Sequence, residues 1–211
     1  MSILDVVRNI TAGQATLSDR EREFYTRHIR ERLSEYRFRH SVNVSKEAVR
    51  LAEKYGGDVA KAELAGLLHD VMKDAGKKEQ LALLEQYDVA LNDVEQQASK
   101  LWHAIAGAVY VRRVLKIRDD DIVNAVRYHT TARAGMSLLE KIVYIADYTS
   151  EERDYKGVEK MRKACNISLE YAMEEALAFG IEVRAEEHTA IHPDTFAAYN
   201  EIMLSKPQKK K

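Results

Sequence analysis

The chain has 211 residues, of which 33 are basic and 34 acidic, so its formal net charge is −1. This balance gives no overall positive field, and we therefore expect neither nucleic acid nor an anionic membrane as a partner. The single cysteine excludes an intramolecular disulfide, and no apolar run approaches the roughly 20 residues of a membrane-spanning helix. The first residues lack the basic segment and long apolar core of a secretory signal, which predicts a cytoplasmic protein.

The composition predicts an all-α fold. The chain is 45% hydrophobic, enough to bury a core of ordinary size, and it contains only two prolines, Pro193 and Pro207. Helix-favouring Ala, Leu, Glu, Lys and Arg dominate, so almost nothing interrupts helices before the C-terminal quarter. We expect a helical N-terminal extension over residues 1–22, one main domain over 23–205 and a basic, disordered tail over 206–211.

The spacing of apolar residues predicts the helices in chain order. Between residues 38 and 55 apolar side chains recur at helical intervals, and the pair Gly56-Gly57 ends the pattern. The next helix is expected to start after Asp58, its N-cap, and to continue to Gly76. Later helical patterns cover residues 77–86, 92–115, 119–129, 137–149, 157–180 and 194–204.

Four histidines lie within or at the end of separate helical patterns: His40, His69, His103 and His129. A single histidine in such a place is more often a hydrogen-bonded core residue than a metal ligand. His69, however, is followed at once by Asp70 among leucines, where burying both groups is costly unless they are hydrogen-bonded or bind a metal. Asp147 follows the apolar stretch KIVYIA and either joins them, caps a helix or pairs with an arginine.

The donor atoms indicate which ions such a site would hold. Imidazole nitrogens and carboxylate oxygens suit first-row transition ions such as iron, manganese or zinc. With one cysteine in the chain, a soft sulfur site is excluded. Calcium, which takes oxygen ligands, does not match this donor set.

The order of these residues, H…HD…H…H…D with gaps of 29, 33, 26 and 18 residues, resembles the HD-domain superfamily of metal-dependent phosphohydrolases. The resemblance covers roughly residues 24–204. Longer phrases resemble its YqeK-like subfamily: YRFRHSVNV, AGLLHDVMKD, WHAIAGA, YHTTARAGMS, KIVYIADYTSEERDYKGVE and IHPDTFAAYN. Members of that subfamily are bacterial hydrolases that split diadenosine tetraphosphate symmetrically into two ADP, with a di-iron centre in an all-α, HD-domain helical bundle.

The resemblance implies a pair of metal ions bridged by Asp70. The remaining ligands divide between the two ions as His40, His69 and Asp147 for one and His103 and His129 for the other. Such a pair lowers the pKa of a shared water, so that a metal-bridging hydroxide can attack phosphorus near neutral pH. We expect two divalent transition-metal ions, iron as first choice with manganese or zinc as alternatives. A homodimer is also implied by the resemblance.

Lys73 lies one helical turn beyond Asp70, so its ammonium can face the same mouth and bind a polyphosphate oxygen. Spacing alone allows a solvated surface lysine equally well, and the resemblance favours phosphate contact. The neighbouring Asp74 could assist proton transfer. Catalytic roles are therefore assigned to Asp70, Lys73, Asp74 and, further along the chain, Arg133.

Arg133 follows His129 by four residues in the segment HTTARAG, where a guanidinium can grip two phosphate oxygens. Arginines in loops usually face water, and here again the resemblance favours substrate contact. The hydroxyl or backbone groups of Thr130 and Thr131 could add hydrogen-bond donors. The segment is therefore predicted to bind the phosphates of the substrate.

The segment after the expected aspartate ligand is predicted to contact the nucleotide through Arg153, Asp154 and Tyr155. A cation and an aromatic ring suit phosphate and base respectively. Here the chain departs from the family, whose usual phrase after the aspartate-tyrosine pair is close to isoleucine-glutamate-proline. This chain has instead Thr149, Ser150 and Glu151. The departure bears on the shape of the loop and on nucleotide affinity, not on the metal site.

His192 opens the segment HPDT, in which the start of a helix already explains Pro193 and Asp194. By resemblance this stretch lines the nucleoside end of the site, and His192 is its candidate contact. The substrate expected from the whole pattern is a small dinucleoside polyphosphate.

Other functions fit parts of the pattern. The chain could be another HD-domain nucleotide phosphohydrolase, such as a hydrolase of guanosine signalling nucleotides. It could be a noncatalytic nucleotide-binding or ribosome-associated factor, although that role does not require the complete ligand set. A simple helical interaction bundle would need every buried histidine and aspartate to find a separate partner. Symmetrical cleavage of diadenosine tetraphosphate remains the leading hypothesis.

Overall fold

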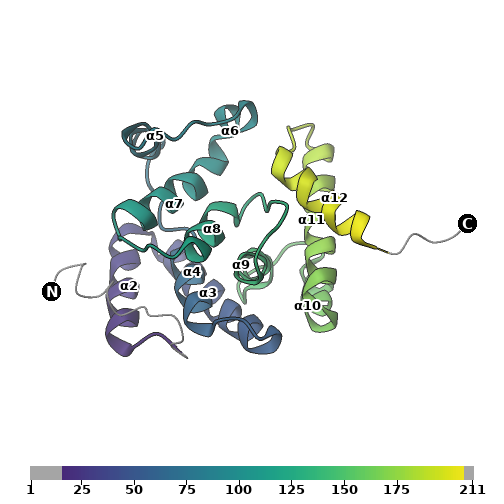
Figure 1. Cartoon of the computed structure of the whole chain (residues 1–211), viewed down its shortest axis with the longest axis horizontal. Coiled ribbons are helices and arrows are strands. Elements are labelled where there is room, and N and C mark those ends of the chain that lie inside the picture. Colours follow the sequence, from purple (N-terminus) through teal and green to yellow (C-terminus); the bar gives the residue numbers. More distant parts are fainter. Residues whose placement is uncertain (1–15, 207–211) are drawn as a thin grey trace, which may run out of the picture.

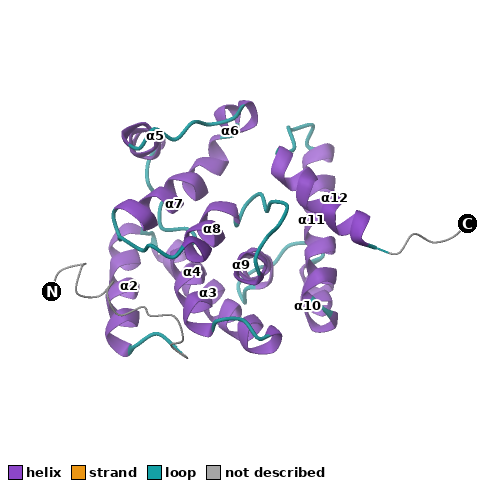
Figure 2. Cartoon of the chain, viewed as in Figure 1, coloured by secondary structure: helices purple, strands orange, loops and turns teal. Residues whose placement is uncertain are grey.

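The computed structural model describes residues 16–206, and this part of the chain consists of helices and loops without a strand (Figure 2). The all-α prediction is confirmed. The helices are α2 (Asp19–Arg32), α3 (Glu35–Tyr55), α4 (Val59–Leu68), α5 (Lys77–Gln86), α6 (Asp93–Gln97), the short 3-10 helix η1 (Ser99–Leu101), α7 (Trp102–Arg113), α8 (Asp120–Tyr128), α9 (Leu138–Thr149), α10 (Val158–Ile167), α11 (Leu169–Glu186) and α12 (Pro193–Ser205).

Helix α9 occupies the middle of the molecule and is seen end-on in Figure 1. Helices α3, α4 and α8 pack against it from one side, and α10 and α11 from the other. Helix α7 packs on α8, and α12 packs on α11. The side chains at the centre are almost all apolar and fully buried, including Leu64, Ile142 and Ala146. The arrangement brings the ends of α4, α8 and α9 close to the N-terminal half of α3.

Polar side chains define where several helices begin. Ser18 and Ser137 each accept a hydrogen bond from the backbone N–H three residues later, and the glutamate at that position bonds back to the serine N–H. These reciprocal bonds satisfy N–H groups that the first turn of a helix leaves unpaired. At the other end, α3 stops where Gly56 adopts a φ of 72°, a left-handed conformation that glycine adopts without steric cost.

The predicted helix boundaries need three corrections. The helix predicted from Asp58 to Gly76 ends at Leu68 and is followed by turns, because the backbone N–H groups of Val71 and Lys73 bond to carbonyls three residues back. The pattern over 92–115 is divided into α6, η1 and α7. The pattern over 157–180 breaks at Ser168, whose side chain caps α11, and that helix continues to Glu186.

The predicted boundaries between extension, main domain and tail remain predictions. Helix α2 runs across the boundary placed at residues 22 and 23, and it packs on α3 and α4. Residues 1–15 of the predicted extension and 207–211 of the predicted tail lie outside the described residues. Within residues 16–206, no helix combines the length and the apolar character needed to cross a membrane.

Gly66 lets α4 approach α3 closely. A Cβ atom at this position would lie 2.8 Å from the Cα of Ser45, so a larger residue must push the two helices apart. We expect Gly66→Val to lower the free energy of unfolding by about 2–3 kcal/mol, measured by urea titration. Gly76→Ser is the control, because a Cβ there meets nothing within 4 Å. An unchanged urea midpoint in Gly66→Val would show that this close approach is not required.

Candidate metal centre

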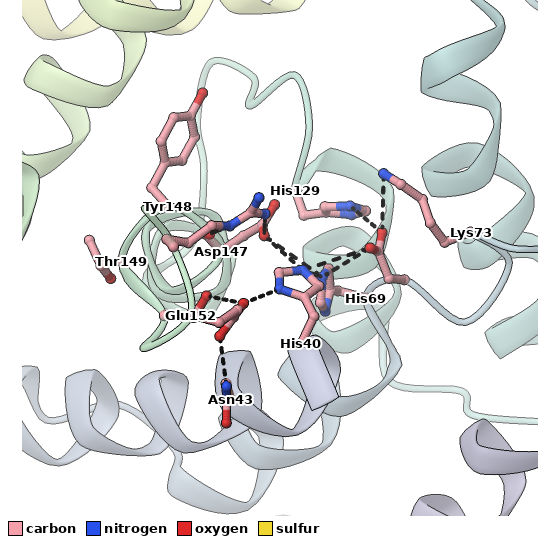
Figure 3. Close-up of polar contacts among 12 residues, drawn as sticks. His40, Asn43, His69, Lys73, His129, Asp147, Tyr148, Thr149 and Glu152 are labelled. Carbon is pink, nitrogen blue, oxygen red and sulfur yellow. Dashed lines mark hydrogen bonds and ion pairs between the residues drawn. The ribbon is translucent and has the colours of Figure 1, made fainter. Parts of the chain in front are cut away.

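Six polar side chains from five parts of the fold meet beside α9. Their positions follow from where the helices end: His40 lies in α3, His69 and His129 are the C-caps of α4 and α8, and His103 is in the first turn of α7. Asp147 stands in the last turn of α9, and Asp70 follows His69 directly. All six predicted ligands are therefore brought together, and Figure 3 labels His40, His69, His129 and Asp147 around the same centre.

The first group lies around His40. Its Nε2 atom is 3.1 Å from Nε2 of His69 and 3.1 Å from Oδ1 of Asp147. The Oδ2 atom of Asp70 lies 3.7 Å from Nε2 of His40 and 3.7 Å from Nε2 of His69. Three of these residues, His40, His69 and Asp147, offer ligand atoms close enough together to share one ion.

The second group lies around the other oxygen of Asp70. Its Oδ1 atom is 3.1 Å from Nε2 of His103 and 3.4 Å from Nε2 of His129. These two nitrogens are 3.3 Å apart. The two oxygens of one buried carboxylate thus face two different groups of imidazoles, which is the arrangement that a bridging ligand between two ions requires.

Backbone carbonyls orient three of the four imidazoles. The Nδ1 atom of His69 lies 2.7 Å from the carbonyl oxygen of Gly66. The corresponding distances are 2.8 Å from His103 to Lys100 and 2.8 Å from His129 to Val126. A carbonyl can only accept, so Nδ1 must carry the proton, and the lone pair of Nε2 points into the centre. This is the tautomer in which Nε2 can bind a metal.

Burial and neighbouring charges shape the protonation of the centre. Burial lowers the pKa of His69 to about 3, so its imidazole is neutral and its lone pair is available. Burial alone would favour the neutral form of Asp70, but the surrounding imidazoles outweigh it and hold the pKa of Asp70 well below its usual range. Asp147 likewise has a pKa well below its usual range despite its burial, because the His40 imidazole and the Arg153 guanidinium lie beside its carboxylate.

The cluster fits a pair of transition-metal ions. The Oδ1 atom of Asp70 is buried and accepts no hydrogen bond, although Nε2 of His103 lies 3.1 Å away. A buried anionic oxygen without such a bond is costly, and a cation between it and the imidazoles would satisfy both. A second set of possible ligands for one ion comprises His69, Asp70 and His129. Nitrogen and oxygen donors of this kind suit iron, manganese or zinc.

Three cations lie beside the centre: Arg37, Lys73 and Arg153. The sequence analysis had identified Lys73 and Arg153. Nζ of Lys73 is 3.0 Å from Nε2 of His103 and 3.6 Å from Oδ1 of Asp70. Arg37, which the sequence analysis did not single out, lies 3.5 Å from Oδ2 of the same carboxylate. The side chains of Lys73 and Arg37 are 27% and 28% exposed, whereas Asp70 is 2% exposed. The two cations therefore stand between the buried carboxylate and solvent.

The guanidinium of Arg153 donates hydrogen bonds to both the backbone carbonyl and the carboxylate of the metal-ligand candidate Asp147. Tyr155 donates a hydrogen bond of 3.0 Å to the carbonyl of Tyr148, and its ring stacks on that of Phe179 at 5.2 Å. Asp154 is exposed. Of this predicted substrate segment, only the arginine contacts a member of the cluster.

The predicted phosphate-binding segment after His129 is tied to neighbouring elements. The guanidinium of Arg133 donates to Oε1 of Glu140 over 3.1 and 2.8 Å. The Thr131 hydroxyl donates to the carbonyl of Ala132, whereas the Thr130 hydroxyl is buried without a hydrogen-bond partner. Thr130 is therefore the member of this segment with unused hydrogen-bonding capacity.

Two of the predicted site residues, Asp74 and His192, make hydrogen bonds that give them a structural role. Asp74 is exposed and accepts a hydrogen bond of 2.7 Å from the backbone N–H of Ser34, just before α3. His192 is the N-cap of α12, where its Nδ1 atom accepts from the N–H of Asp194, and its Nε2 atom lies 3.0 Å from the side-chain amide of Asn92. Neither contact involves the six clustered residues.

Glu152 was also missed by the sequence analysis. Its Oε1 atom is hydrogen-bonded to Nδ1 of His40, and Figure 3 shows it on the side of His40 away from His129. The residue follows directly after the segment that departs from the family pattern. Its position next to this segment was the one feature of the sequence that could have drawn attention to Glu152. A local departure from the family pattern, however, does not show which distant side chain the loop will contact.

The chain resembles known proteins over most of its length. A family model described as the HD domain matches residues 37–152. The symmetrical bis(5'-nucleosyl)-tetraphosphatase of Halalkalibacterium halodurans is 39% identical over 176 residues, which span 83% of this chain and 94% of the relative. That of Bacillus subtilis is 36% identical over 172 residues, spanning 82% and 92%.

A solved structure gives the same picture of the fold. The crystal structure of a predicted HD superfamily hydrolase involved in NAD metabolism, from Clostridium acetobutylicum, aligns with a TM-score of 0.84 and 36% identity. The alignment covers 88% of this chain and 98% of that one. From the family model and from the identity to relatives over most of their length, this chain belongs to the HD-domain proteins and, among them, to the YqeK-type family of symmetrical bis(5'-nucleosyl)-tetraphosphatases.

Proposed function

We propose that this protein hydrolyses diadenosine tetraphosphate symmetrically into two ADP at the six-residue cluster. The observation that carries the proposal is the placement of Asp70, whose two oxygens face separate groups of imidazoles. The family gives the substrate, since the curated relatives are symmetrical bis(5'-nucleosyl)-tetraphosphatases. A noncatalytic factor would have no need for a buried carboxylate placed between two sets of ligands.

The proposed cofactor is a pair of divalent transition-metal ions, with iron as first choice and manganese or zinc as alternatives. One ion would be held by His40, His69 and Asp147, and the other by His103 and His129, with Asp70 shared. When bound, such a pair activates water near neutral pH and neutralises charge on phosphate oxygens. For such a pair the chain supplies three imidazoles, those of His69, His103 and His129, whose rings are fixed by hydrogen bonds at Nδ1. It also supplies the carboxylates of Asp70 and Asp147, whose low pKa values keep them ionised.

Arg37 and Lys73 are proposed to bind the phosphates next to the cleaved bond. They flank the two oxygens of Asp70, one on each side, and both reach solvent. When metal ions neutralise Asp70, the ammonium and the guanidinium can turn to phosphate oxygens, which they bind by charge-assisted hydrogen bonds. Two phosphates on either side of the cleaved bond would then each meet one cation.

The charge of the centre suits a tetraphosphate. Three carboxylates and three cations contact one another or the imidazoles, so their formal charges cancel. The carboxylates are those of Asp70, Asp147 and Glu152, and the cations are Arg37, Lys73 and Arg153. With two divalent ions in place the centre would carry about four positive charges. A bridge of four phosphates between two nucleosides carries one negative charge per phosphate, so substrate and centre would be matched in charge.

The other predicted contacts with the substrate remain predictions. Arg133 is held by Glu140, and its NH1 atom makes only a 3.4 Å contact with a carbonyl, so NH1 is the part that can meet a phosphate. The unpartnered Thr130 hydroxyl is a candidate donor to the substrate. The contacts of Arg153 and His192 favour positioning roles for these two residues. The homodimer and the cytoplasmic location likewise remain predictions.

The products of the reaction test the proposal. Diadenosine tetraphosphate should give ADP alone, and in oxygen-18 water half of the ADP molecules should carry one labelled oxygen, because one water enters per pair of products. The triphosphate-bridged analogue should give ADP and AMP, more slowly because its far end fits less well. Chromatography with mass spectrometry measures both. ATP with AMP from the tetraphosphate would contradict symmetrical cleavage, and no hydrolysis would leave another HD-domain activity as the better explanation.

A further inference from the structure

His40 differs from the other three histidines of the centre in what holds its ring. The Nδ1 atoms of His69, His103 and His129 meet backbone carbonyls three residues earlier in the chain. The Nδ1 atom of His40 meets instead the carboxylate of Glu152, which is 112 residues away in sequence. The ring orientation of this one histidine therefore depends on a side chain from a different part of the fold.

Glu152 is itself held in place. The side-chain amide of Asn43, one turn beyond His40 on α3, donates to Oε2 over 2.8 Å. The hydroxyl of Ser150 donates to Oε1 over 2.8 Å. The side chain of Glu152 is only 19% exposed. Figure 3 shows these contacts running from Asn43 through Glu152 to His40.

The loop that carries Glu152 is fixed by a single arginine. Arg162 of α10 donates hydrogen bonds to four backbone carbonyls of this segment, those of Thr149, Ser150, Glu151 and Arg153. The Thr149 hydroxyl bonds to Glu47 of α3. This is the segment whose sequence departs from the family phrase, and its bonds show that it has a defined shape. That shape delivers the carboxylate to the Nδ1 side of His40.

We infer that Glu152 is a positioning residue that sets the metal affinity of the group formed by His40, His69 and Asp147. A carboxylate at Nδ1 fixes the tautomer and the orientation of the ring, and its negative charge makes Nε2 a stronger donor to a cation. The inference rests on the metal centre of the proposed function, but not on its substrate. It assigns to the departing loop a role at the metal centre, whereas the sequence predicted only a role in nucleotide binding.

The test compares Glu152→Ala and Glu152→Gln with Glu151→Gln, a control at the exposed neighbouring glutamate. Purified, metal-depleted proteins are titrated with Mn²⁺ in the presence of a competing chelator, and bound metal per chain is measured. Loss of a carboxylate that orients a ligand lowers metal affinity about 10- to 100-fold. We expect Glu152→Ala to lose this much for one of the two ions, so that about one ion per chain remains at chelator concentrations where wild type keeps two.

The Gln variant separates orientation from a general structural effect. Its amide oxygen can still accept the proton of Nδ1 while the charge is lost, so it should recover part of the affinity that Ala loses. Glu151→Gln should match wild type. Circular dichroism of the metal-free variants checks that the helices are intact.

Wild-type Mn²⁺ affinity in folded Glu152→Ala would overturn the inference, as would a wild-type protein that binds no ion. Loss of diadenosine tetraphosphate hydrolysis alone, with this affinity pattern intact, would contradict only the proposed function.

Discussion

Asp70→Ala protein is expected to lose both of its metal ions and its hydrolysis of diadenosine tetraphosphate. The substitution removes the one carboxylate whose two oxygens face both groups of imidazoles, so negative charge is withdrawn from both metal positions at once. Loss of a fixed electrostatic group in an active site typically costs on the order of 10²–10³ in rate, and loss of the metals adds to this. Elemental analysis and the rate of ADP formation measure the two effects on the same preparation.

A control for the loss of charge is Asp93→Asn, at an exposed aspartate in the first turn of α6. This variant should keep the metal content and the rate of wild type. Full occupancy by two ions in an active Asp70→Ala protein would contradict the assignment of Asp70 as the bridging ligand.

Arg37→Ala and Lys73→Ala are each expected to lower the rate or the substrate affinity roughly ten- to hundredfold while retaining metal. The reason is that a charge-assisted hydrogen bond contributes about 1.5–3 kcal/mol. Both side chains lie within 4 Å of Asp70 and reach solvent, so each can exchange a contact within the centre for one with phosphate. Steady-state kinetics with diadenosine tetraphosphate and metal analysis give the two readouts.

Arg39→Ala is the matched control for the arginine, because it lies on the same helix two residues later and is exposed. Arg37→Lys keeps the charge but loses the planar fork, so it should recover only part of the lost affinity if two phosphate oxygens are gripped. If both Arg37→Ala and Lys73→Ala have the kinetics of wild type, these residues do not bind the substrate and are ordinary surface residues. A loss of metal in either variant would instead indicate a role in holding the centre together.

Much of the candidate metal centre could be predicted because its chemistry lies in residue types and spacing. A histidine followed by aspartate among leucines, with further histidines at the ends of helical patterns, is costly to bury without a metal or hydrogen bonds. The same pattern could not say how the rings are oriented. That depends on the carbonyl at Gly66 for His69 and on Glu152 for His40. The first contact is local and the second joins residues from opposite halves of the chain.

The sequence by itself determined the helical class, the identity of the six candidate ligands and the family, since composition, apolar spacing and local motifs carry that information. Only the tertiary structure decided that α4 stops at Leu68, where turn hydrogen bonds replace a helix that the local pattern would have continued. Only the packing of α3 against α4 and α9 placed Arg37 beside Asp70 and Glu152 beside His40. Such contacts arise from side chains far apart in sequence, and no local pattern of apolar or charged residues encodes them.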